Sequence, residues 1–201
     1  DVSGPSATES PSARRFPGRT ETRSRIRVGT AKMNILMPRE DIDACLTILE
    51  QHRPKLVLEW GCGGSTVRFS QFSTVERWHC IEHDLKWVEA VSGQTSTKVV
   101  VHHASIDSEE YVLCPKRLGL VPYLILVDGR RRNDCLRLAR DLVAPNGVVL
   151  LHDASRDRYE EGISRFAGRR VMTRGAGGTR PVDRHSTNGL YWHQGITALY
   201  A

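Results

Sequence analysis

The sequence predicts an α/β domain, with helices on both faces of a mostly parallel sheet. Three observations predict it: helix-like and strand-like segments alternate after residue 33, the strand-like segments are short and apolar, and a glycine-rich turn follows the first of them. Alternation of this kind is typical of α/β sheets. A glycine turn between a strand and a helix is where such sheets bind ligands.

The first half of the chain opens with a predicted helix over 38–52. Pro38 suits a first turn, and the acids that follow it favour a helix N-terminus. Apolar residues then recur at helical spacing and end before Pro54. Strands are predicted at 55–60, 77–82 and 98–102, and helices at 65–72 and 85–91.

The second half continues the alternation. Strands are predicted at 123–128 and 148–152, and helices at 135–142 and 159–166. Two closing strands are predicted at 170–173 and 190–193 with no strong helix between them. Because parallel strands need a longer crossover, we expect this last pair to form an antiparallel hairpin at a sheet edge.

Residues 1–32 differ in composition from the predicted domain over 33–201. They hold six arginines, five serines and three prolines but only three acidic residues. Such a composition does not pack a core, so we expect a disordered basic tail. It is similar to a plastid or mitochondrial transit remnant, and a nonspecific basic tail explains it equally well.

Charge and cysteine content narrow the class of protein. No apolar run approaches the ~20 residues that a membrane helix requires. The net charge of +6 favours anionic partners. The five cysteines form no CxxC pair and no zinc spacing, which favours an intracellular, reducing compartment over secretion. Nothing in the sequence predicts an oligomeric state.

The glycine-rich turn carries the clearest functional signal. It reads Glu-Trp-Gly-Cys-Gly-Gly-Ser over 59–65. The dinucleotide fingerprint G-x-G-x-x-G fails here, because Thr66 stands where the third glycine is required. A carboxylate at Glu59 repels a pyrophosphate but can accept hydrogen bonds from an ammonium. S-adenosylmethionine carries an ammonium and no phosphate, so this charge favours the methyl donor over NAD.

A second acid lies at a matching distance along the chain. Glu82 ends the second predicted strand, 19 residues after Gly63. That spacing suits a carboxylate that hydrogen-bonds ribose hydroxyls.

The segments 56–66 and 81–84 resemble the first and second motifs of class I S-adenosylmethionine-dependent methyltransferases. The resemblance covers roughly 38–193. It implies a Rossmann-like, doubly wound seven-stranded sheet whose last strand is reversed. It also implies that the acids and glycines of both motifs hold the cofactor and that the segment after the third strand contacts adenine. The cofactor residues expected on this basis are Glu59, Gly61, Cys62, Gly63, Ser65, Glu82, His83 and Ser105.

Two acids at the ends of neighbouring strands are the candidate catalytic residues. Asp128 follows the fourth predicted strand, and Asp153 follows the fifth directly after His152. These segments resemble a methyltransferase subgroup that acts on hydroxyls, part of which binds Mg²⁺ with acids at these positions. Such an ion lowers the pKa of a substrate hydroxyl. The third ligand of that subgroup is replaced here by Ala154.

A metal-free mechanism is the alternative. His152 or Asp153 then acts as general base for a hydroxyl. Arg130 and Arg131, at the mouth of the predicted cleft, favour an acidic substrate, because guanidinium groups bind carboxylate or phosphate in bidentate fashion.

The sequence therefore predicts an enzyme that methylates a hydroxyl of a small or carbohydrate-like acceptor. Two alternatives stay open: a methyltransferase-fold module without catalysis in a larger assembly, and an RNA methyltransferase. Methyltransferases that act on amino groups carry an Asn/Asp-Pro-Pro-Tyr-type loop after the fourth strand, and this chain lacks it. The absence argues against an amino group as the acceptor on RNA but permits a ribose hydroxyl.

Overall fold

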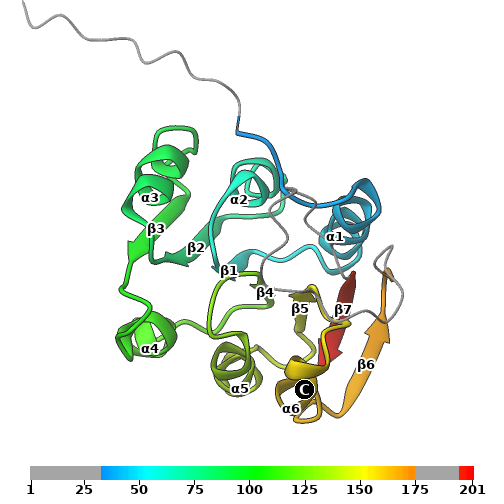
Figure 1. Ribbon diagram of the computed structural model, residues 1–201. Helices are drawn as coiled ribbons and strands as arrows, with labels where there is room; N and C mark the ends of the chain where they lie inside the picture. The colour runs from blue at the N-terminus through cyan, green and yellow to red at the C-terminus, as the bar shows by residue number, and fades with distance from the viewer. Residues whose placement is uncertain (1–32, 175–194) are drawn as a thin grey trace, which may run out of the picture. The chain divides into compact units, whose positions relative to one another are not determined.

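The computed structural model describes residues 33–174 and 195–201. In these residues seven strands form one sheet in the order β3-β2-β1-β4-β5-β7-β6 (Figure 1). All neighbouring pairs are parallel except those made by β7, which runs antiparallel to both β5 and β6. The strands are β1 (Leu56–Trp60), β2 (Arg77–Glu82), β3 (Val99–His103), β4 (Leu124–Val127), β5 (Val148–His152), β6 (Gly168–Val171) and β7 (Ile196–Tyr200).

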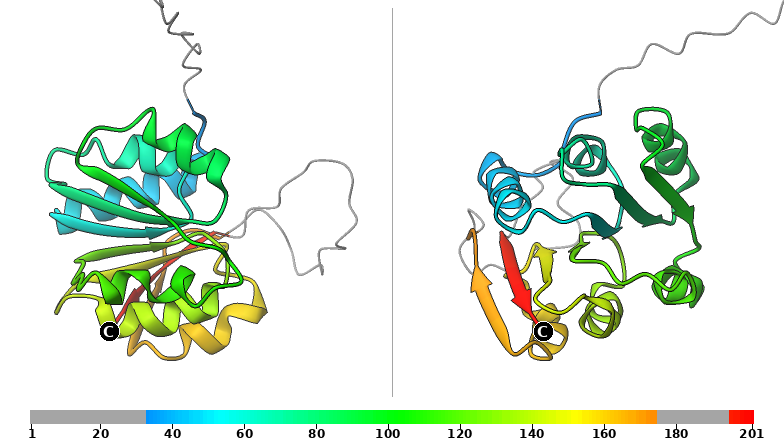
Figure 2. Two further views of the ribbon diagram at one scale, coloured as in Figure 1. Left: turned by 90° about the vertical axis from the view of Figure 1, so that its left-hand side faces the viewer. Right: turned by 180° about the vertical axis from the view of Figure 1, so that it is seen from behind.

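Helices cover both faces of the sheet, as Figures 1 and 2 show. One face carries α1 (Arg39–His52), α2 (Gly64–Phe69) and α3 (Leu85–Ser92). The other carries α4 (Glu110–Arg117), α5 (Arg132–Leu142) and α6 (Glu160–Ile163), the last preceded by a short 3₁₀ turn, η1 (Asp157–Tyr159). The predicted α/β class and seven-stranded sheet with a reversed strand are confirmed.

The strand order reverses between β1 and β4. From β1 the chain builds outward through β2 to β3, then returns to place β4 on the other side of β1. Both pairs are in register at their carboxyl ends, where Trp60 faces Ile81 on one side and Val127 on the other. An open sheet binds its ligand at such a switch point, outside the carboxyl ends of the strands.

Most predicted elements that fall on described residues agree with the structure to within a few residues. The predicted helix over 65–72 ends at Phe69. The helix α4 was not predicted, because it carries Pro115 and only a weak apolar stripe. The last strand is Ile196–Tyr200, whereas the strand predicted at 190–193 lies outside the described residues, as does the tail predicted over 1–32.

The sheet separates two apolar clusters, and strand alternation decides which side chain joins which cluster. Along β1, Leu58 and Trp60 pack beneath α4 and α5, whereas Val57 packs beneath α1 and α2. Glu59 alternates with its neighbours, so its side chain points to the same face as that of Val57. It is fully buried there.

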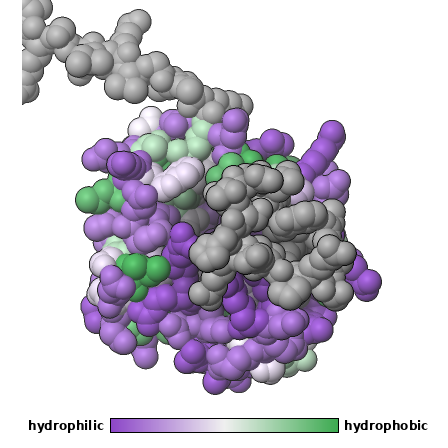
Figure 3. All heavy atoms as spheres, in the orientation of Figure 1, coloured by the Kyte–Doolittle hydropathy of each residue, from purple (hydrophilic) through white to green (hydrophobic). Residues whose placement is uncertain are grey.

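The surface offers no large apolar patch among the described residues. The exposed large hydrophobic residues are few, and only Leu118 and Val121, between α4 and β4, are close along the chain; the others are Leu36, Leu85 and Val171. Figure 3 shows hydrophobic residues on the visible face as small patches in a mostly hydrophilic surface. Of the described helices, none has the length and apolar character needed to cross a membrane.

Two histidines on β2 and on the neighbouring edge strand β3 predict that acid lowers the stability of the fold. Nδ1 of His79 lies 3.0 Å from Nε2 of His102, and the rings stack at 5.3 Å. Burial lowers the pKa of both, and the nearby His102 adds to the effect on His79. Because the folded pKa lies below the unfolded value of about 6.5, stability is full above that pH and falls as the pH drops below it. We expect His79→Gln to flatten this acid limb in thermal unfolding between pH 7.5 and 5; an unchanged limb contradicts the assignment.

Candidate functional site

The glycine loop lies at the switch point and touches the loop after β4. Gly61 directly follows β1 and has φ of +91°, a conformation that side-chain-bearing residues rarely adopt. A Cβ on Gly61 would lie 2.6 Å from the Cα of Gly129, so the two backbones are in contact. The Gly61 N–H donates to the Ile81 carbonyl, which also ties the loop to β2. The loop is therefore fixed on both sides of the switch point.

This contact explains why glycine is required at one position of the loop and not at another. We expect Gly61→Ala to destabilise the domain by roughly 1–3 kcal/mol, because it combines a strained φ with a backbone clash. Gly63→Ala is the matched control, since its φ of −179° is extended and its Cβ would meet only Trp87, at 3.8 Å. Chemical denaturation of both variants checks the difference. Equal losses would contradict it.

Glu82 joins the second strand to the glycine loop. Its Oε2 accepts a hydrogen bond from the backbone N–H of Cys62 at 3.1 Å, and its Oε1 accepts from the N–H groups of His83 and Asp84 at 2.7 and 2.9 Å. The His83 ring lies 2.6 Å from the same oxygen. Oε2 has one hydrogen bond and keeps a lone pair for a further donor, such as a ribose hydroxyl. Cys62 and His83 thus both contact Glu82 at the switch point, where an open sheet has its ligand crevice. The cofactor role expected for these three residues stays a prediction.

Glu59 does not line that crevice, which corrects the role expected for it and for Ser65. Its Oε1 accepts from the Ser65 hydroxyl at 2.7 Å, and its Oε2 accepts from the Thr66 hydroxyl at 2.6 Å and from Nε1 of Trp78 at 2.9 Å. Its side chain has no exposed surface, so it cannot meet an ammonium in the crevice. The carboxylate instead fixes the first turn of α2 to the sheet.

Ser105 lies just beyond the carboxyl end of β3. It is exposed, and its hydroxyl accepts a weak hydrogen bond from the N–H of Asp107 at 3.4 Å. Its contact with adenine remains a prediction.

The candidate catalytic residues belong to a chain of charged groups at the ends of β4 and β5. His152 is buried, with Nδ1 2.8 Å from Oδ1 of Asp128 and Nε2 3.2 Å from Oδ2 of Asp41 on α1. Asp41 also accepts a hydrogen bond from the hydroxyl of Thr173. A histidine between two carboxylates is held as an imidazolium.

His152 is therefore a poor general base, contrary to the metal-free prediction. Burial by itself lowers the pKa of His152, but hydrogen bonds to Asp128 and Asp41 outweigh it and raise the pKa to about 9. Both ring nitrogens face carboxylates, so neither can take a proton from a substrate. The positively charged ring instead links α1 to the end of β4 through its contacts with Asp41 and Asp128.

Asp128 and Asp153 do not form the predicted magnesium pair. The Arg132 guanidinium lies between them, 3.0 Å from Oδ1 of Asp128 and 3.3 Å from Oδ2 of Asp153, and Arg156 lies 2.7 Å from the same Asp153 oxygen. Arg132 also donates to the carbonyls of Asp128 and Gly129. Cations already occupy the carboxylates that a metal would use, and in the described part of the chain no three potential ligands gather into a metal site. The donor set does not fit Mg²⁺.

Arg130 and Arg131 line a pocket beyond β4, and their expected contact with an acidic substrate stays a prediction. The pocket has a volume of about 480 Å³ and is bounded by the loops that follow β4 and β5. Gly129, which touches Gly61, forms part of its wall.

Sequence reasoning missed three partners of this site: Asp41, Arg132 and Tyr111. Asp41 was taken only as an acid that suits a helix N-terminus. Arg132 directly follows the two arginines that the sequence singles out. Tyr111 lies on α4, the helix that was not predicted. Its hydroxyl oxygen accepts a hydrogen bond from the backbone N–H of Arg130 at 2.9 Å. No signal in the sequence links these residues to β4 and β5.

Comparison with known proteins agrees with the strand order. No protein-family model and no curated protein sequence matches the chain. Solved structures do match. A Staphylococcus aureus protein provisionally assigned as a caffeoyl-CoA O-methyltransferase superposes with a TM-score of 0.58 at 12% identity, over 84% of this chain and 86% of that one. A precorrin-6y C5,15-methyltransferase from Geobacter metallireducens gives 0.56 at 14% identity, over 84% and 93%.

A protein of unknown function from Deinococcus radiodurans also matches, with a TM-score of 0.51 at 17% identity over 69% of this chain. The chain spans 66% of that protein's length. At these identities the likeness bears on the fold. Taken with the sheet order and the reversed strand β7, it shows that this chain has the Rossmann-like fold of the class I methyltransferases.

Proposed function

We propose that the chain is an S-adenosylmethionine-dependent methyltransferase that methylates a hydroxyl of a small, carbohydrate-like acceptor. One observation carries the proposal: the glycine loop after β1 and Glu82 at the end of β2 are hydrogen-bonded to each other at the point where the strand order reverses. This is the position at which an open α/β sheet binds a nucleoside-bearing ligand.

The residues at the crevice fit this cofactor. Oε2 of Glu82 accepts one hydrogen bond and has a lone pair for a ribose hydroxyl. Gly63 leaves space beside the loop, since an added Cβ would meet only Trp87. The backbone of Gly61 contacts the backbone of Gly129, in the loop after β4. When bound, the cofactor supplies an electrophilic methyl group on a sulfonium.

Asp128 is the residue that orients the hydroxyl of the methyl acceptor. Its Oδ1 faces both His152 and Arg132, and its side chain is 22% exposed. Because two cations hold this carboxylate in one orientation, its other oxygen can accept a hydrogen bond from an acceptor hydroxyl. Methyl transfer needs in-line placement above all, so an orienting carboxylate beside the loop is the main requirement.

Binding of S-adenosylmethionine and S-adenosylhomocysteine tests the cofactor half of the proposal. Calorimetry should give dissociation constants in the micromolar range, roughly −8 kcal/mol. Glu82→Gln should weaken both by about tenfold or more, because it removes a charged hydrogen-bond acceptor. Glu89→Gln, an exposed acid on α3, is the matched control and should change nothing. A folded protein that releases no heat with either compound at millimolar concentration contradicts the proposal.

Transfer itself separates an enzyme from a module that only keeps the fold. Formation of S-adenosylhomocysteine should rise above background with at least one acceptor in a panel of sugars and sugar phosphates. It should fall at least tenfold in Asp128→Asn while the cofactor dissociation constant stays within about twofold. Cofactor binding with no turnover across the panel would instead favour a non-catalytic role.

A further inference from the structure

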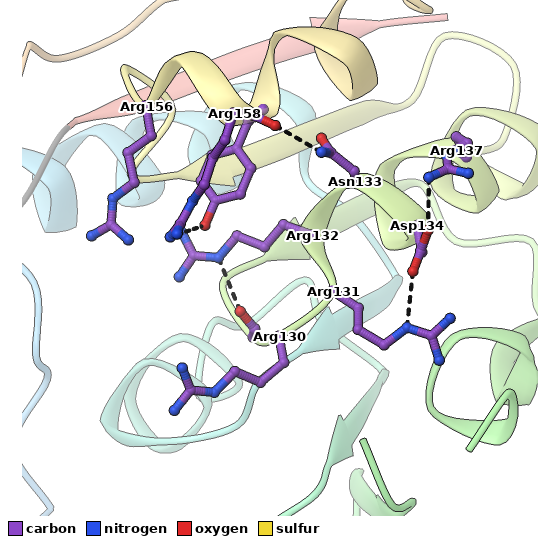
Figure 4. A pocket seen from close by; sticks show the side chains of 10 residues that line it. Arg130, Arg131, Arg132, Asn133, Asp134, Arg137, Arg156 and Arg158 are labelled. Atoms are coloured by element: carbon purple, nitrogen blue, oxygen red, sulfur yellow. Dashed lines mark hydrogen bonds and ion pairs between the residues drawn. The ribbon is translucent and has the colours of Figure 1, made fainter. Parts of the chain in front are cut away.

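Arginines dominate the pocket beyond β4. Its wall includes six of them and a single acid, Asp134. The arginines come from two loops at the carboxyl edge of the sheet and from α5: Arg130, Arg131, Arg132, Arg137, Arg156 and Arg158. In Figure 4 the side chains of Arg131 and Arg137 turn toward Asp134, whereas those of Arg130, Arg132, Arg156 and Arg158 point away from it.

The carboxylates near the pocket neutralise only some of this charge. Asp134 pairs with Arg131 at 2.9 Å and with Arg137 at 2.7 Å. The carboxylates of Asp128 and Asp153 are taken up by Arg132, Arg156 and His152, as described above. Among the described residues, Arg130 and Arg158 have no carboxylate partner, and both are exposed. The pocket therefore has an excess of positive charge that points to an anion.

Two of the guanidinium groups contact an aromatic ring that fixes their positions before any ligand arrives. Those of Arg132 and Arg158 lie 5.5 and 4.9 Å from the centroid of the buried Tyr159 ring, and Arg158 donates to the Tyr159 hydroxyl at 2.9 Å. The side-chain amide of Asn133 donates to the Arg158 carbonyl at 2.7 Å, which ties the loop after β5 to α5. Arginines that are already fixed lose little side-chain entropy when a ligand binds, so less of the binding free energy is spent on ordering them.

The backbone at the start of α5 also favours an anion. The first turn of α5 begins at Arg132 and has no side-chain cap on its N–H groups. Uncapped N–H groups and the positive end of a helix dipole favour an anion. The pocket volume of about 480 Å³ suits a ligand the size of a small metabolite.

The pocket also adjoins the proposed cofactor crevice. Gly129 is in its wall and touches Gly61 of the glycine loop, and Arg130 follows Gly129 directly. An acceptor whose anionic group sits among the arginines can therefore present a hydroxyl toward Asp128 and the loop.

We propose that this arginine pocket binds a phosphate monoester on the methyl acceptor, so that the substrate class is a small phosphorylated polyol or sugar; the assignment as acceptor rests on the proposed function. A phosphate monoester carries nearly two charges at neutral pH and three acceptor oxygens, which matches paired guanidiniums better than one carboxylate does.

Glucose 6-phosphate and glucose form a matched pair of probes, with inorganic phosphate as the minimal ligand. Calorimetry without cofactor should show glucose 6-phosphate binding at least tenfold more tightly than glucose. The double variant Arg130→Gln/Arg158→Gln should remove that preference by tenfold or more. Arg170→Gln removes an exposed charge on β6 that does not line the pocket, and it should change the affinity by less than about twofold.

Three results would overturn the proposal: equal binding of glucose and glucose 6-phosphate, an equal loss in Arg170→Gln, or a single-stranded RNA oligonucleotide that binds tightly and is not displaced by phosphate. Failure of the proposed function has a different signature. Phosphate binding that depends on Arg130 and Arg158 in a protein that does not bind S-adenosylmethionine would uphold the anion site and reject the methyltransferase activity.

Discussion

Replacing Glu59 by alanine is expected to destabilise the domain by about 3–5 kcal/mol, because it leaves three buried donors without an acceptor. Those donors are the hydroxyls of Ser65 and Thr66 and the indole N–H of Trp78. All three residues are buried, so water reaches them poorly. Urea denaturation followed by circular dichroism measures the loss.

Glu59→Gln is the conservative variant, and it separates the hydrogen bonds from the charge. It keeps an acceptor and the side-chain shape, so its loss should be well below that of alanine. Burial raises the pKa of Glu59 to about 7, despite the hydroxyl donors that lower it. Since the folded pKa lies above the unfolded value, this carboxyl contributes stability below about pH 4.5 that is lost as the pH rises through 7.

The glutamine variant should therefore lose that part of the pH dependence. An alanine variant within about 1 kcal/mol of the parent, or a glutamine variant with the parent's pH dependence, would contradict this account of Glu59.

The position of Glu59 also shows where sequence reasoning succeeds and fails. The strands and glycine loop were predictable because their signals are local: short apolar runs, and glycine directly after the first. The side chain of Glu59 was assigned to the crevice although it alternates with Leu58 and Trp60, and strand alternation sends it to the face that α2 covers. Its third donor, Trp78, is 19 residues away on β2.

The charged cluster was beyond sequence reasoning for a different reason. His152 and Asp41 are 111 residues apart, and only the packing of α1 against the end of β5 brings them together. The same holds for Arg132, whose two carboxylates come from the ends of separate strands. Acids at strand ends predict a polar site, but the partner that decides between a metal, a base and an ion pair comes from the tertiary fold.

The described strand nearest the C-terminus is not the segment that the sequence predicted as the last strand. The segment 190–193 reads Leu-Tyr-Trp-His, with strong strand propensity, and was predicted as the last strand. In the structure Ile196–Tyr200 pairs with β5 and β6, and Ile196, Ala198 and Leu199 fill the core between them. Burial on both faces favours this apolar run for a central strand.

Removal of the His152 imidazole should have an effect as large as that of Glu59→Ala. His152→Ala leaves the carboxylates of Asp41 and Asp128 close together without the cation between them, and breaking a buried ion pair on one side costs about 3–5 kcal/mol. Asp41→Asn in the same chain should recover part of this loss, because it removes one of the two facing charges. Urea denaturation of the parent, both single variants and the double variant measures the coupling.

The pH dependence of the same parent protein tests the charge state of the ring. Because the folded pKa of about 9 lies above the ordinary value of 6.5, the stability that His152 contributes is complete below about pH 6.5 and is lost as the pH rises through 9. The parent should therefore lose stability between pH 7 and 10, and His152→Ala should show a flatter curve over that range. If the two curves are parallel, the ring is neutral in the folded protein. In that case the argument from a permanent imidazolium would fail, and only the two carboxylates that face the ring nitrogens would stand against base catalysis by His152.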